Sequence, residues 1–374
     1  MRKISNIYRL GVKEFWSLLR DPVLQVLIVY SFTGSIYVAA TGMPGTLNNA
    51  AIAIVDEDQS VLSTRIIASF HPPHFMPPEE ISLDEVDPGL DMGTYTFVLN
   101  IPPYFQRDVL AGDAPALQLL VDATRISQAF SGSGAIHQTV LGQVNEFVQG
   151  RAGSAPAPVA LALRARFNPV LEVEWFASVM EIINRVTMLS ILLAGAALIR
   201  EREHGTVEHL LVMPVTPGEI MVAKIWSMGL VVLVGTAFAL TFIVRMMLGV
   251  PIEGSVALFL FCATLHLFAT TSMGIFMATV ARSMPEFGIL LILTILPLRM
   301  LSGSATPRES MPEFVQNIML AAPTTHFVSA AQAILYRGAG FDVVWPQCLV
   351  LMTIGMVFFI IALTRFRKTI ETFA

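Results

Sequence analysis

Residues 254–281 read GSVALFLFCATLHLFATTSMGIFMATVA, a run of 28 residues without one charged side chain. A helix of about 20 consecutive apolar residues is long enough to cross a lipid bilayer. The run therefore predicts a membrane-spanning helix, and the whole chain agrees with it: of 374 residues, 54% are hydrophobic and only 14% are charged. A typical soluble domain carries about 25% charged residues. The composition favours an integral membrane protein and argues against a disordered chain, a nucleic-acid-binding protein or an ordinary soluble enzyme.

Five further stretches are long and apolar enough to span the membrane. Two of them are interrupted, one by Glu181 and Arg185 and the other by Pro297 and Arg299. The predicted fold class is a mainly helical, polytopic membrane protein with a long polar insertion between its first two spans. The predicted spans are 23–41, 176–199, 222–248, 254–281, 286–306 and 343–364, and the insertion is 42–175.

Lysine and arginine residues indicate on which side of the membrane the loops lie, because cytoplasmic flanks are enriched in them. The predicted spans place twelve of these residues on one side, whereas the short loops on the other side hold only Arg308 and Arg337. The asymmetry predicts that both termini are cytoplasmic and that the polar insertion lies outside. The twelve are Arg2, Lys3, Arg9, Lys13, Arg20, Arg200, Arg202, Lys224, Arg282, Arg365, Arg367 and Lys368.

The insertion at 42–175 alternates predicted strands with predicted helices, which indicates a small extracytoplasmic α/β domain. Its acidic residues outnumber its basic ones 15 to 6, which fits a soluble surface; a cation-binding role is the alternative. His71 and His74 have no third ligand nearby, so we expect no metal site there. The strands are predicted at 50–56, 95–101 and 116–122, and the helices at 59–70, with Ser60 as a cap, 103–111 and 127–151.

The first 22 residues predict an amphipathic helix at the cytoplasmic membrane surface. Apolar side chains such as Phe15 and Trp16 are interspersed with basic ones such as Arg9 and Lys13, and Asp21-Pro22 breaks the helix before the first span. Helices of this kind bind in the membrane interface. A basic flank that only orients the chain is the alternative interpretation.

The loop at 200–221 predicts a second short helix on the cytoplasmic side. Thr206 follows Gly205 and is suited to cap a helix whose first turn holds Glu208. Thr216-Pro217-Gly218-Glu219 has the pattern of a further helix start. A short helix that is charged at one end and apolar along one face suits docking into another protein; a hairpin that only connects two spans is the alternative. The candidate docking residues are Glu201, Glu203, Gly205, Thr206, Val207, Glu208, Leu210 and Leu211.

Charged residues inside the predicted spans are candidates for a transport pathway, because ionisable groups in a membrane usually pair or serve a function. Glu181 and Arg185 are four residues apart and share a helix face, which places them to form an ion pair; an extension into water is the alternative. Arg299 follows Pro297, where we expect a break in the helix that frees a carbonyl group. His266, alone in an apolar span, is expected to form a hydrogen bond between helices.

The sequence contains no motif for ATP hydrolysis. None of its four lysines follows a G-x-x-x-x-G run, and neither a zinc-protease nor a serine-hydrolase motif is present. We therefore expect a non-enzymatic chain that binds no cofactor. If the protein pumps a substrate, a separate subunit hydrolyses the ATP.

Several motifs follow one another along nearly the whole chain: Val55-Asp-Glu-Asp-Gln-Ser, Ile101-Pro-Pro-Tyr-Phe, Glu201-Arg-Glu-His-Gly-Thr-Val-Glu-His-Leu-Leu, Met213-Pro-Val-Thr-Pro, Leu301-Ser-Gly and Ala322-Pro-Thr-Thr-His-Phe. No single motif is diagnostic, but the ordered set resembles the permease subunits of ABC-2-type export transporters. The first helix and the loop helix, with Gly205 to Glu208, resemble the parts of such permeases that contact the ATPase.

The resemblance implies a permease of a bacterial inner membrane that exports its substrate with energy from an ABC ATPase, the subunit that binds ATP and Mg²⁺. It also implies that 307–342 re-enters the outer leaflet as short helices and that 365–374 is a cytoplasmic tail. A second permease chain is expected to complete the transporter, and a periplasmic adaptor is a further expected partner. A membrane-anchored binding or assembly protein without transport activity is the alternative function, and an intramembrane enzyme is the third.

Overall fold

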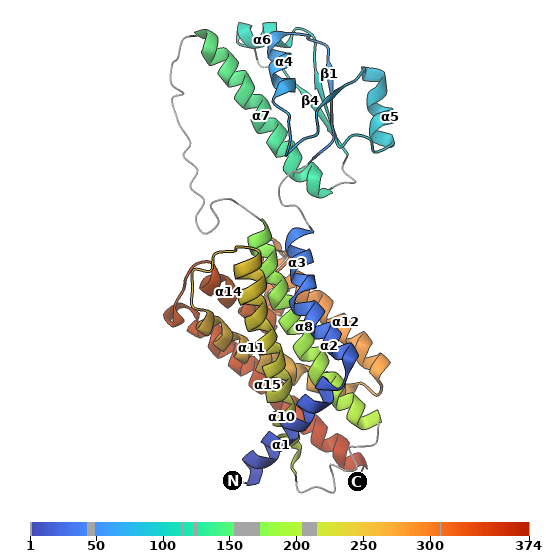
Figure 1. The fold of residues 1–374 in the computed structure, drawn as a ribbon, viewed down its shortest axis with the longest axis vertical. Coiled ribbons are helices and arrows are strands. Elements are labelled where there is room, and N and C mark those ends of the chain that lie inside the picture. The colour runs from blue at the N-terminus through green and yellow to red at the C-terminus, as the bar shows by residue number, and fades with distance from the viewer. Residues whose placement is uncertain are drawn as a thin grey trace. The chain divides into compact units, whose positions relative to one another are not determined.

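The computed structural model describes residues 2–42, 49–113, 115–122, 126–152, 173–203, 215–306 and 308–373. The chain divides into two compact units, one made of Met1–Gly42 with Trp175–Ala374 and the other of Met43–Glu174. We call the first the helical unit and the second the sheet unit (Figure 1). Each has a hydrophobic core of its own.

The helical unit carries the membrane spans. Among the described residues, six helices are long and apolar enough to cross a membrane, which is the number that the sequence predicts. These six candidate spans run over Pro22–Thr41, Trp175–Glu203, Pro217–Met247, Val256–Val280, Met284–Leu301 and Phe341–Lys368. The elements of the unit are α1 (Arg2–Leu19), α2 (Pro22–Phe32), α3 (Gly34–Thr41), α8 (Val173–Glu203), α10 (Pro217–Phe238), the π-helix η2 (Ala239–Met247), α11 (Val256–Val280), α12 (Met284–Leu301), the 3₁₀-helix η3 (Arg308–Ser310), α13 (Glu313–Met319), α14 (Pro323–Leu335) and α15 (Phe341–Phe373).

Two helices of this unit begin where the sequence supplies a cap and a proline. Asp21 accepts hydrogen bonds from the backbone N–H groups at the start of α2, whose first residue is Pro22. Thr216 and Glu219 form a capping box at the start of α10, as the sequence predicts. Proline suits the first helical position in both places because its missing N–H would have no intrahelical partner there.

The end of α12 differs from the sequence-based expectation. The helix continues through Pro297, where we expected a break, and it ends at Leu301, earlier than predicted. A membrane helix tolerates an internal proline because its surroundings can satisfy the freed backbone groups. The chain turns instead at Gly303, whose φ of +95° favours glycine. Ser304 then donates a hydrogen bond of 2.7 Å to the Arg299 carbonyl oxygen in the last turn of α12.

The segment after α12 forms the short helices α13 and α14, whose axes differ by 90°. Pro312 immediately precedes α13, and Pro323 is the first residue of α14. Each proline therefore stands where a helix begins rather than inside one. The depth of these helices in the membrane stays a prediction.

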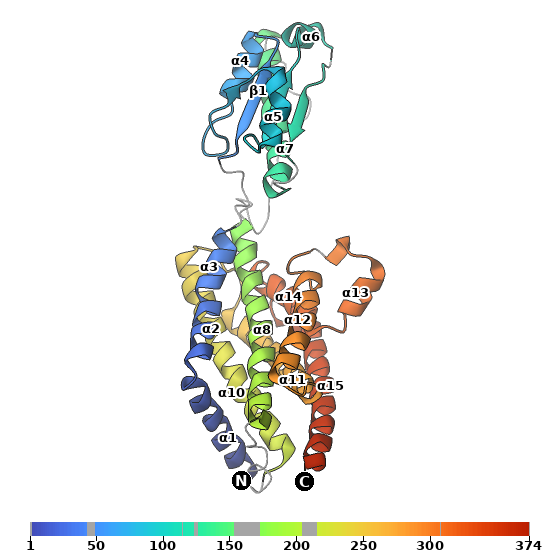
Figure 2. The same ribbon diagram turned by 90° about the vertical axis from the view of Figure 1, so that its right-hand side faces the viewer.

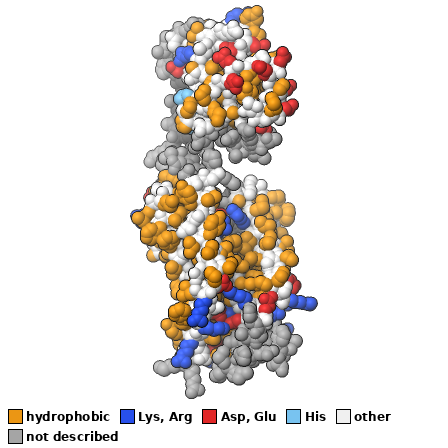
Figure 3. Space-filling model, turned by 45° about the vertical axis from the view of Figure 1, so that its right-hand side comes forward, with side chains coloured by type: hydrophobic (Ala, Val, Ile, Leu, Met, Phe, Trp, Pro, Cys, Tyr) orange, Lys and Arg blue, Asp and Glu red, His pale blue; other side chains and the backbone are white. Residues whose placement is uncertain are grey.

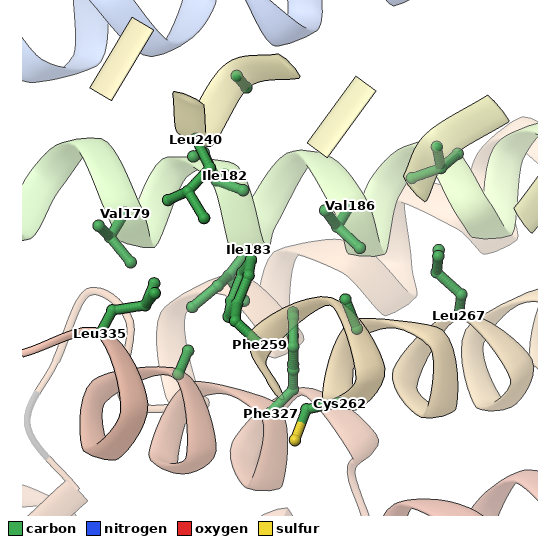
Figure 4. Close-up of a cluster of buried hydrophobic side chains, with 14 of the residues drawn as sticks. Val179, Ile182, Ile183, Val186, Leu240, Phe259, Cys262, Leu267, Phe327 and Leu335 are labelled. Carbon is green, nitrogen blue, oxygen red and sulfur yellow. The ribbon is translucent and has the colours of Figure 1, made fainter. Parts of the chain in front are cut away.

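The core of the helical unit is built around α8. Ile183 of α8 clusters with Phe259 of α11 and Phe327 of α14 (Figure 4). α11 approaches α8 closely at Gly274, where a Cβ atom would lie 2.4 Å from the carbonyl oxygen of Ile191. Small residues allow membrane helices to pack at short distances. At Ile191, α8 is therefore held by close backbone packing as well as by side chains.

The two ends of the helical unit are distinct. α1 and the end of α15 lie at one end, which we call the α1 end; α3, α13 and α14 lie towards the other, which we call the α14 end (Figure 2). Apolar side chains cover much of the surface between them, and Lys, Arg, Asp and Glu gather towards the α1 end (Figure 3). This distribution fits helices that cross a bilayer.

The sheet unit contains a four-stranded mixed sheet in the order β2-β1-β3-β4. β1 is parallel to β2 and β3, whereas β3 and β4 are antiparallel. The predicted strands are present as β1, β3 and β4; β2 has only two residues and no alternation that sequence could reveal. The elements are β1 (Ile52–Asp56), α4 (Val61–Ala68), β2 (Glu79–Glu80), η1 (Leu83–Glu85), α5 (Val86–Asp91), β3 (Phe97–Ile101), α6 (Phe105–Ala111), β4 (Gln118–Val121) and α7 (Ile126–Ala152).

Helices cover both faces of this sheet. Successive strand residues point to opposite faces, so Ile54 and Leu99 join a core with α4, α6 and α7, whereas Val55 and Val98 join a smaller core with α5. Ser60 caps α4 through a hydrogen bond from the Ser63 N–H, as the sequence predicts. The central strands β1 and β3 are thus buried on both faces, which explains why they are apolar, whereas the edge strands β2 and β4 are more exposed.

Candidate functional site

Four charged side chains meet between α1, α8 and α10 at the α1 end. The Lys224 ammonium lies 2.9 Å from Glu14 Oε1 and 2.8 Å from Glu201 Oε2, and the Lys13 ammonium lies 2.9 Å from Glu201 Oε1. Lys224 is only 1% exposed. Two ammonium groups face two carboxylates, so the charges balance where burial would otherwise be costly. These four residues, which we call the clamp cluster, tie α1 to the two helices that flank residues 204–214.

Trp226 of α10 extends the same contact. Its ring lies parallel to that of Tyr8 at a centroid distance of 6.2 Å and tilted against Phe15 at 5.8 Å. Its indole N–H donates a 3.2 Å hydrogen bond to the Ile7 carbonyl oxygen. Gly11 of α1 faces the ring, where a Cβ atom would lie 2.1 Å from a ring carbon. α1 therefore packs on α10 at a distance that only glycine permits.

The last turn of α8 also holds two neighbouring helices. Arg202 donates 2.9 Å hydrogen bonds to the carbonyl oxygens of Ala278 and Ala281 at the end of α11. Glu203 accepts a 2.9 Å hydrogen bond from the Met284 N–H at the start of α12. These side chains satisfy backbone groups that helix ends leave without intrahelical partners. A displacement of this turn would therefore also displace α1, α10, α11 and α12.

The surroundings of the two α1 members of the clamp cluster, Lys13 and Glu14, raise the pKa of both groups. Burial raises the pKa of the Glu14 carboxyl, Lys224 and Lys13 oppose this, Glu201 adds to it, and the net direction is upward. Burial lowers the pKa of the Lys13 ammonium, but the Glu201 and Glu14 carboxylates raise it more, so its net direction is also upward. Two neighbouring carboxylates disfavour each other's charge, and the two lysines offset this repulsion.

The structure places the predicted docking and interfacial residues in different situations. Lys13 and Phe15 of α1 contact α8 and α10, whereas Arg9 and Trp16 are exposed. An exposed tryptophan on an amphipathic helix suits a membrane interface. Of the docking set, Glu201 and Glu203 make the contacts described above; Gly205, Thr206, Val207, Glu208, Leu210 and Leu211 lie outside the described residues.

Sequence reasoning missed Lys224 and Glu14 as partners. Lys224 is counted above only as one of the cytoplasmic cations. Its neighbours one helical turn away, Ile220 and Met228, are apolar, so no partner is available on its own helix. A lysine surrounded by apolar residues is the signal that a carboxylate must come from elsewhere. The spacing does not reveal which helix supplies it.

A second ion cluster lies near the start of α8, towards the α14 end. Glu181 is 3% exposed, pairs with Arg185 one turn later, and lies 3.3 Å from the Arg299 guanidinium of α12. Ser35 of α3 donates a further 3.3 Å hydrogen bond to it. The ion pair between Glu181 and Arg185 is the one that their spacing predicts. Glu181, Arg185 and Arg299, which we call the Glu181 cluster, set two cations against one carboxylate.

The Glu181 cluster borders a cavity of about 30 Å³ that also touches Thr324 at the start of α14. That volume corresponds to about one water molecule. The three charged pathway candidates are therefore brought together, but a substrate could pass between them only if the helices separate. Pro297 lies inside α12 and is absent from the wall of this cavity.

An uncharged polar contact lies on α8 between the two ion clusters. The Thr187 hydroxyl lies 2.9 Å from His266 Nε2 of α11, and the Ser190 hydroxyl donates a 2.7 Å hydrogen bond to Thr270 one turn farther on. His266 is completely buried, and its ring stacks on Phe327 at 4.4 Å. The expected role of His266 as a hydrogen-bonding group between helices is thus confirmed.

Comparison with known proteins identifies the family. Residues 15–364 match the family model described as ABC-2 family transporter protein. The chain is 63% identical over 374 residues to the inner membrane transport permease YhhJ of Escherichia coli (strain K12), with both chains covered completely. It is 26% identical over 376 residues to the probable multidrug ABC transporter permease YbhR of the same organism, covering 98% of this chain and 99% of that protein.

A third relative matches only part of the chain. The probable multidrug ABC transporter permease YbhS of Escherichia coli (strain K12) is 28% identical over 176 residues, which is 46% of each protein. The match to YhhJ covers both ion clusters and all candidate spans, and the family model covers the Glu181 cluster together with Glu201 and Lys224. The chain therefore belongs to the ABC-2 transporter family, as a membrane permease.

Proposed function

We propose that this permease moves its substrate outward across the inner membrane, driven by ATP hydrolysis on a separate ABC ATPase that docks at the α1 end. The sequence lacks a phosphate-binding loop, so a pump built from this chain requires a partner that hydrolyses ATP. The excess of lysine and arginine in the loops and termini of this end favours a cytoplasmic location. An ATPase can reach only that side.

The clamp cluster is the observation that carries the proposal. Lys224 joins Glu14 of α1 to Glu201 of α8 through contacts of 2.9 and 2.8 Å. Residues 204–214 connect α8 to α10, so the clamp cluster links the two helices that flank this loop to each other and to α1. A partner that pushes on the loop therefore moves three helices and, through Arg202 and Glu203, the ends of two more. A passive membrane anchor has no need for such a connection.

The other expected parts of the transporter follow from the same orientation. The sheet unit would be the extracytoplasmic α/β domain, where its acidic surface meets water or a periplasmic adaptor. Only 11% of the apolar stretch of α12 is buried, which leaves a helix face for lipid or for a second permease chain. The relatives YbhR and YbhS are named as probable multidrug permeases; hydrophobic or toxic compounds are accordingly the substrate class that we propose for this chain.

The decisive experiment is co-purification of the tagged, full-length permease in mild detergent, followed by an ATPase assay. We expect an ABC ATPase to co-elute and its hydrolysis to be stimulated by the permease. Glu208→Lys and Gly205→Pro should each lower the stimulated rate about tenfold, which corresponds to about 1.4 kcal/mol of lost coupling. Membrane insertion should be unchanged, because neither residue lies in a predicted span.

Asp91→Lys is the matched control, because it reverses an exposed charge in the sheet unit, far along the chain from the loop. It should leave both co-elution and stimulation intact. Equal stimulation in Glu208→Lys, Gly205→Pro and the unmodified permease would contradict docking through this loop. Recovery of periplasmic proteins alone, without nucleotide hydrolysis, would favour the membrane-anchored binding protein instead.

A further inference from the structure

A cavity of about 500 Å³ lies at the α14 end of the helical unit. Its wall is formed by the start of α8, by α14, by α15 and by the turn that follows α12. Its volume is within the range of about 300–1,000 Å³ that small-molecule sites occupy, unlike the small space beside the Glu181 cluster. The wall includes the polar side chains of Arg308, Thr325, Arg337 and Gln347.

The charge of this cavity is one-sided. The short loops on the predicted outer side contain only two cations, Arg308 and Arg337, and both line this cavity. Neither aspartate nor glutamate occurs among the described residues of its wall. Arginine on the outer side runs against the usual distribution in inner-membrane proteins. Two arginines converging on one cavity without a carboxylate therefore suggest a negatively charged ligand.

Polar atoms in the cavity wall also lack partners. Arg308 Nε and Thr325 Oγ1 are buried, and neither makes a hydrogen bond within the described structure. Thr325 is 5% exposed, so bulk water is a poor substitute. Buried polar atoms in native proteins nearly always have a partner. The side-chain oxygen of Gln347 is unpaired as well, and rotation of that amide by half a turn would present its N–H groups instead.

The start of α14 adds a third favourable feature. Thr325 lies in the first turn of this 13-residue helix, and the N-cap residue Ala322 provides no side-chain acceptor for the first N–H groups. A helix start carries partial positive charge. The cavity thus combines two guanidinium groups, a hydroxyl donor and an uncapped helix start, which is the set of groups that binds phosphate.

We propose that this cavity binds a phosphate-type anionic group, with Arg308 and Thr325 as its principal hydrogen-bond donors and Arg337 adding charge at the rim. Such a group is carried by an acidic lipid or amphiphile and also by free inorganic phosphate. The helices α12 and α15, which precede and follow these residues in the chain, carry exposed apolar side chains. They favour the amphiphile, because its acyl chains need an apolar surface. The proposal concerns binding alone and does not depend on export or on an ATPase.

The test is native mass spectrometry of the full-length permease in mild detergent, titrated separately with phosphatidylglycerol, which is anionic, and with phosphatidylcholine, which is zwitterionic. We expect phosphatidylglycerol to bind about tenfold more tightly, and Arg308→Gln to weaken its binding about tenfold by removing a charge-assisted hydrogen bond. Thr325→Val should weaken it about threefold. Both changes are close to the original side chains in size, so the fold should persist.

Arg245→Gln is the control, because Arg245 is an exposed arginine of η2 that does not line the cavity. It should leave lipid binding unchanged. Displacement of phosphatidylglycerol by inorganic phosphate would support a site that also takes the free anion, whereas its failure would support a site that requires acyl chains. Equal binding of the two lipids, or equal losses in Arg308→Gln and Arg245→Gln, would overturn the proposal.

Discussion

The two ion clusters on α8 differ in charge balance. At the α1 end, Lys13 and Lys224 face Glu14 and Glu201, so the charges cancel. Near the start of the same helix, the single carboxylate of Glu181 faces Arg185 and Arg299, which leaves an excess positive charge. Lys224 is 1% exposed, whereas the Arg299 side chain is 51% exposed. Each cluster therefore has one exposed cation, since the Lys13 side chain is 52% exposed, and what separates the two is that the first is neutral and the second carries excess positive charge.

The difference suggests different roles. A neutral cluster gains nothing from a ligand, but removal of its buried cation Lys224 leaves buried carboxylates without a sufficient partner. A cluster with two cations for one carboxylate still has a balanced pair when one cation is removed, and its excess charge can attract an anion. The clamp cluster therefore fits a mechanical connection between helices, and the Glu181 cluster fits a place where substrate or moving helices exchange contacts.

Lys224→Met gives the largest expected effect, because it leaves two buried carboxylates with only Lys13 between them. Methionine has a similar length, so packing is largely kept. We expect a loss of about 3–5 kcal/mol in the free energy of unfolding, measured by chemical unfolding of the purified permease in detergent micelles. Adding Glu14→Gln should recover much of this loss, because the Lys13–Glu201 pair then remains intact.

Lys3→Met is the control for that change, since Lys3 is an exposed lysine of the same α1 helix. It should alter the free energy of unfolding by less than about 0.5 kcal/mol. A similar small effect for Lys224→Met would mean that the clamp cluster does not hold α1 in place, and the comparison between the two clusters would lose its basis.

Arg299→Gln should have the opposite profile, a small effect on stability and a larger one on activity. Glu181 keeps Arg185 as a partner after this change, so we expect a change of about 0–1 kcal/mol in the free energy of unfolding. If the excess charge serves transport, ATP turnover by the assembled transporter should fall about tenfold, equivalent to about 1.4 kcal/mol in the barrier. Arg245→Gln, another exposed arginine of the helical unit, should change neither quantity. Full turnover in Arg299→Gln would exclude this residue from the transport cycle.

Local chemistry explains which features could be predicted from sequence. The spans, the caps at Ser60 and Thr216, and the pair formed by Glu181 and Arg185 each depend on residues within a few positions of one another. Hydropathy, capping and helical spacing are sufficient to recognise them. The same reasoning correctly expected His266 to bond between helices, because an isolated polar group in an apolar span needs a partner.

The remaining features depend on contacts between residues distant in the chain. Glu14 and Lys224 are 210 positions apart, and no periodicity relates them. The break expected at Pro297 was wrong because local rules treat proline as an obstacle, whereas the surroundings of a membrane helix can absorb it. The turn at Gly303 was overlooked because a glycine with positive φ has no distinct signature among other glycines. The large cavity also combines α8, α14 and α15, which sequence alone does not bring together.

Thr187→Val gives the smallest expected effect and measures the uncharged contact between the two clusters. The valine has nearly the same shape but cannot bond to His266, so the imidazole loses its 2.9 Å partner. Hydrogen bonds between membrane helices contribute about 0.6 kcal/mol on average and at most about 1.7, and we expect a loss within that range in the same detergent unfolding assay. Thr187→Ser keeps the hydroxyl and should retain most of the bond, which separates its contribution from that of the methyl group. A loss as large as that of Lys224→Met would show that burial along α8, and not charge balance, sets the cost of removing a polar partner.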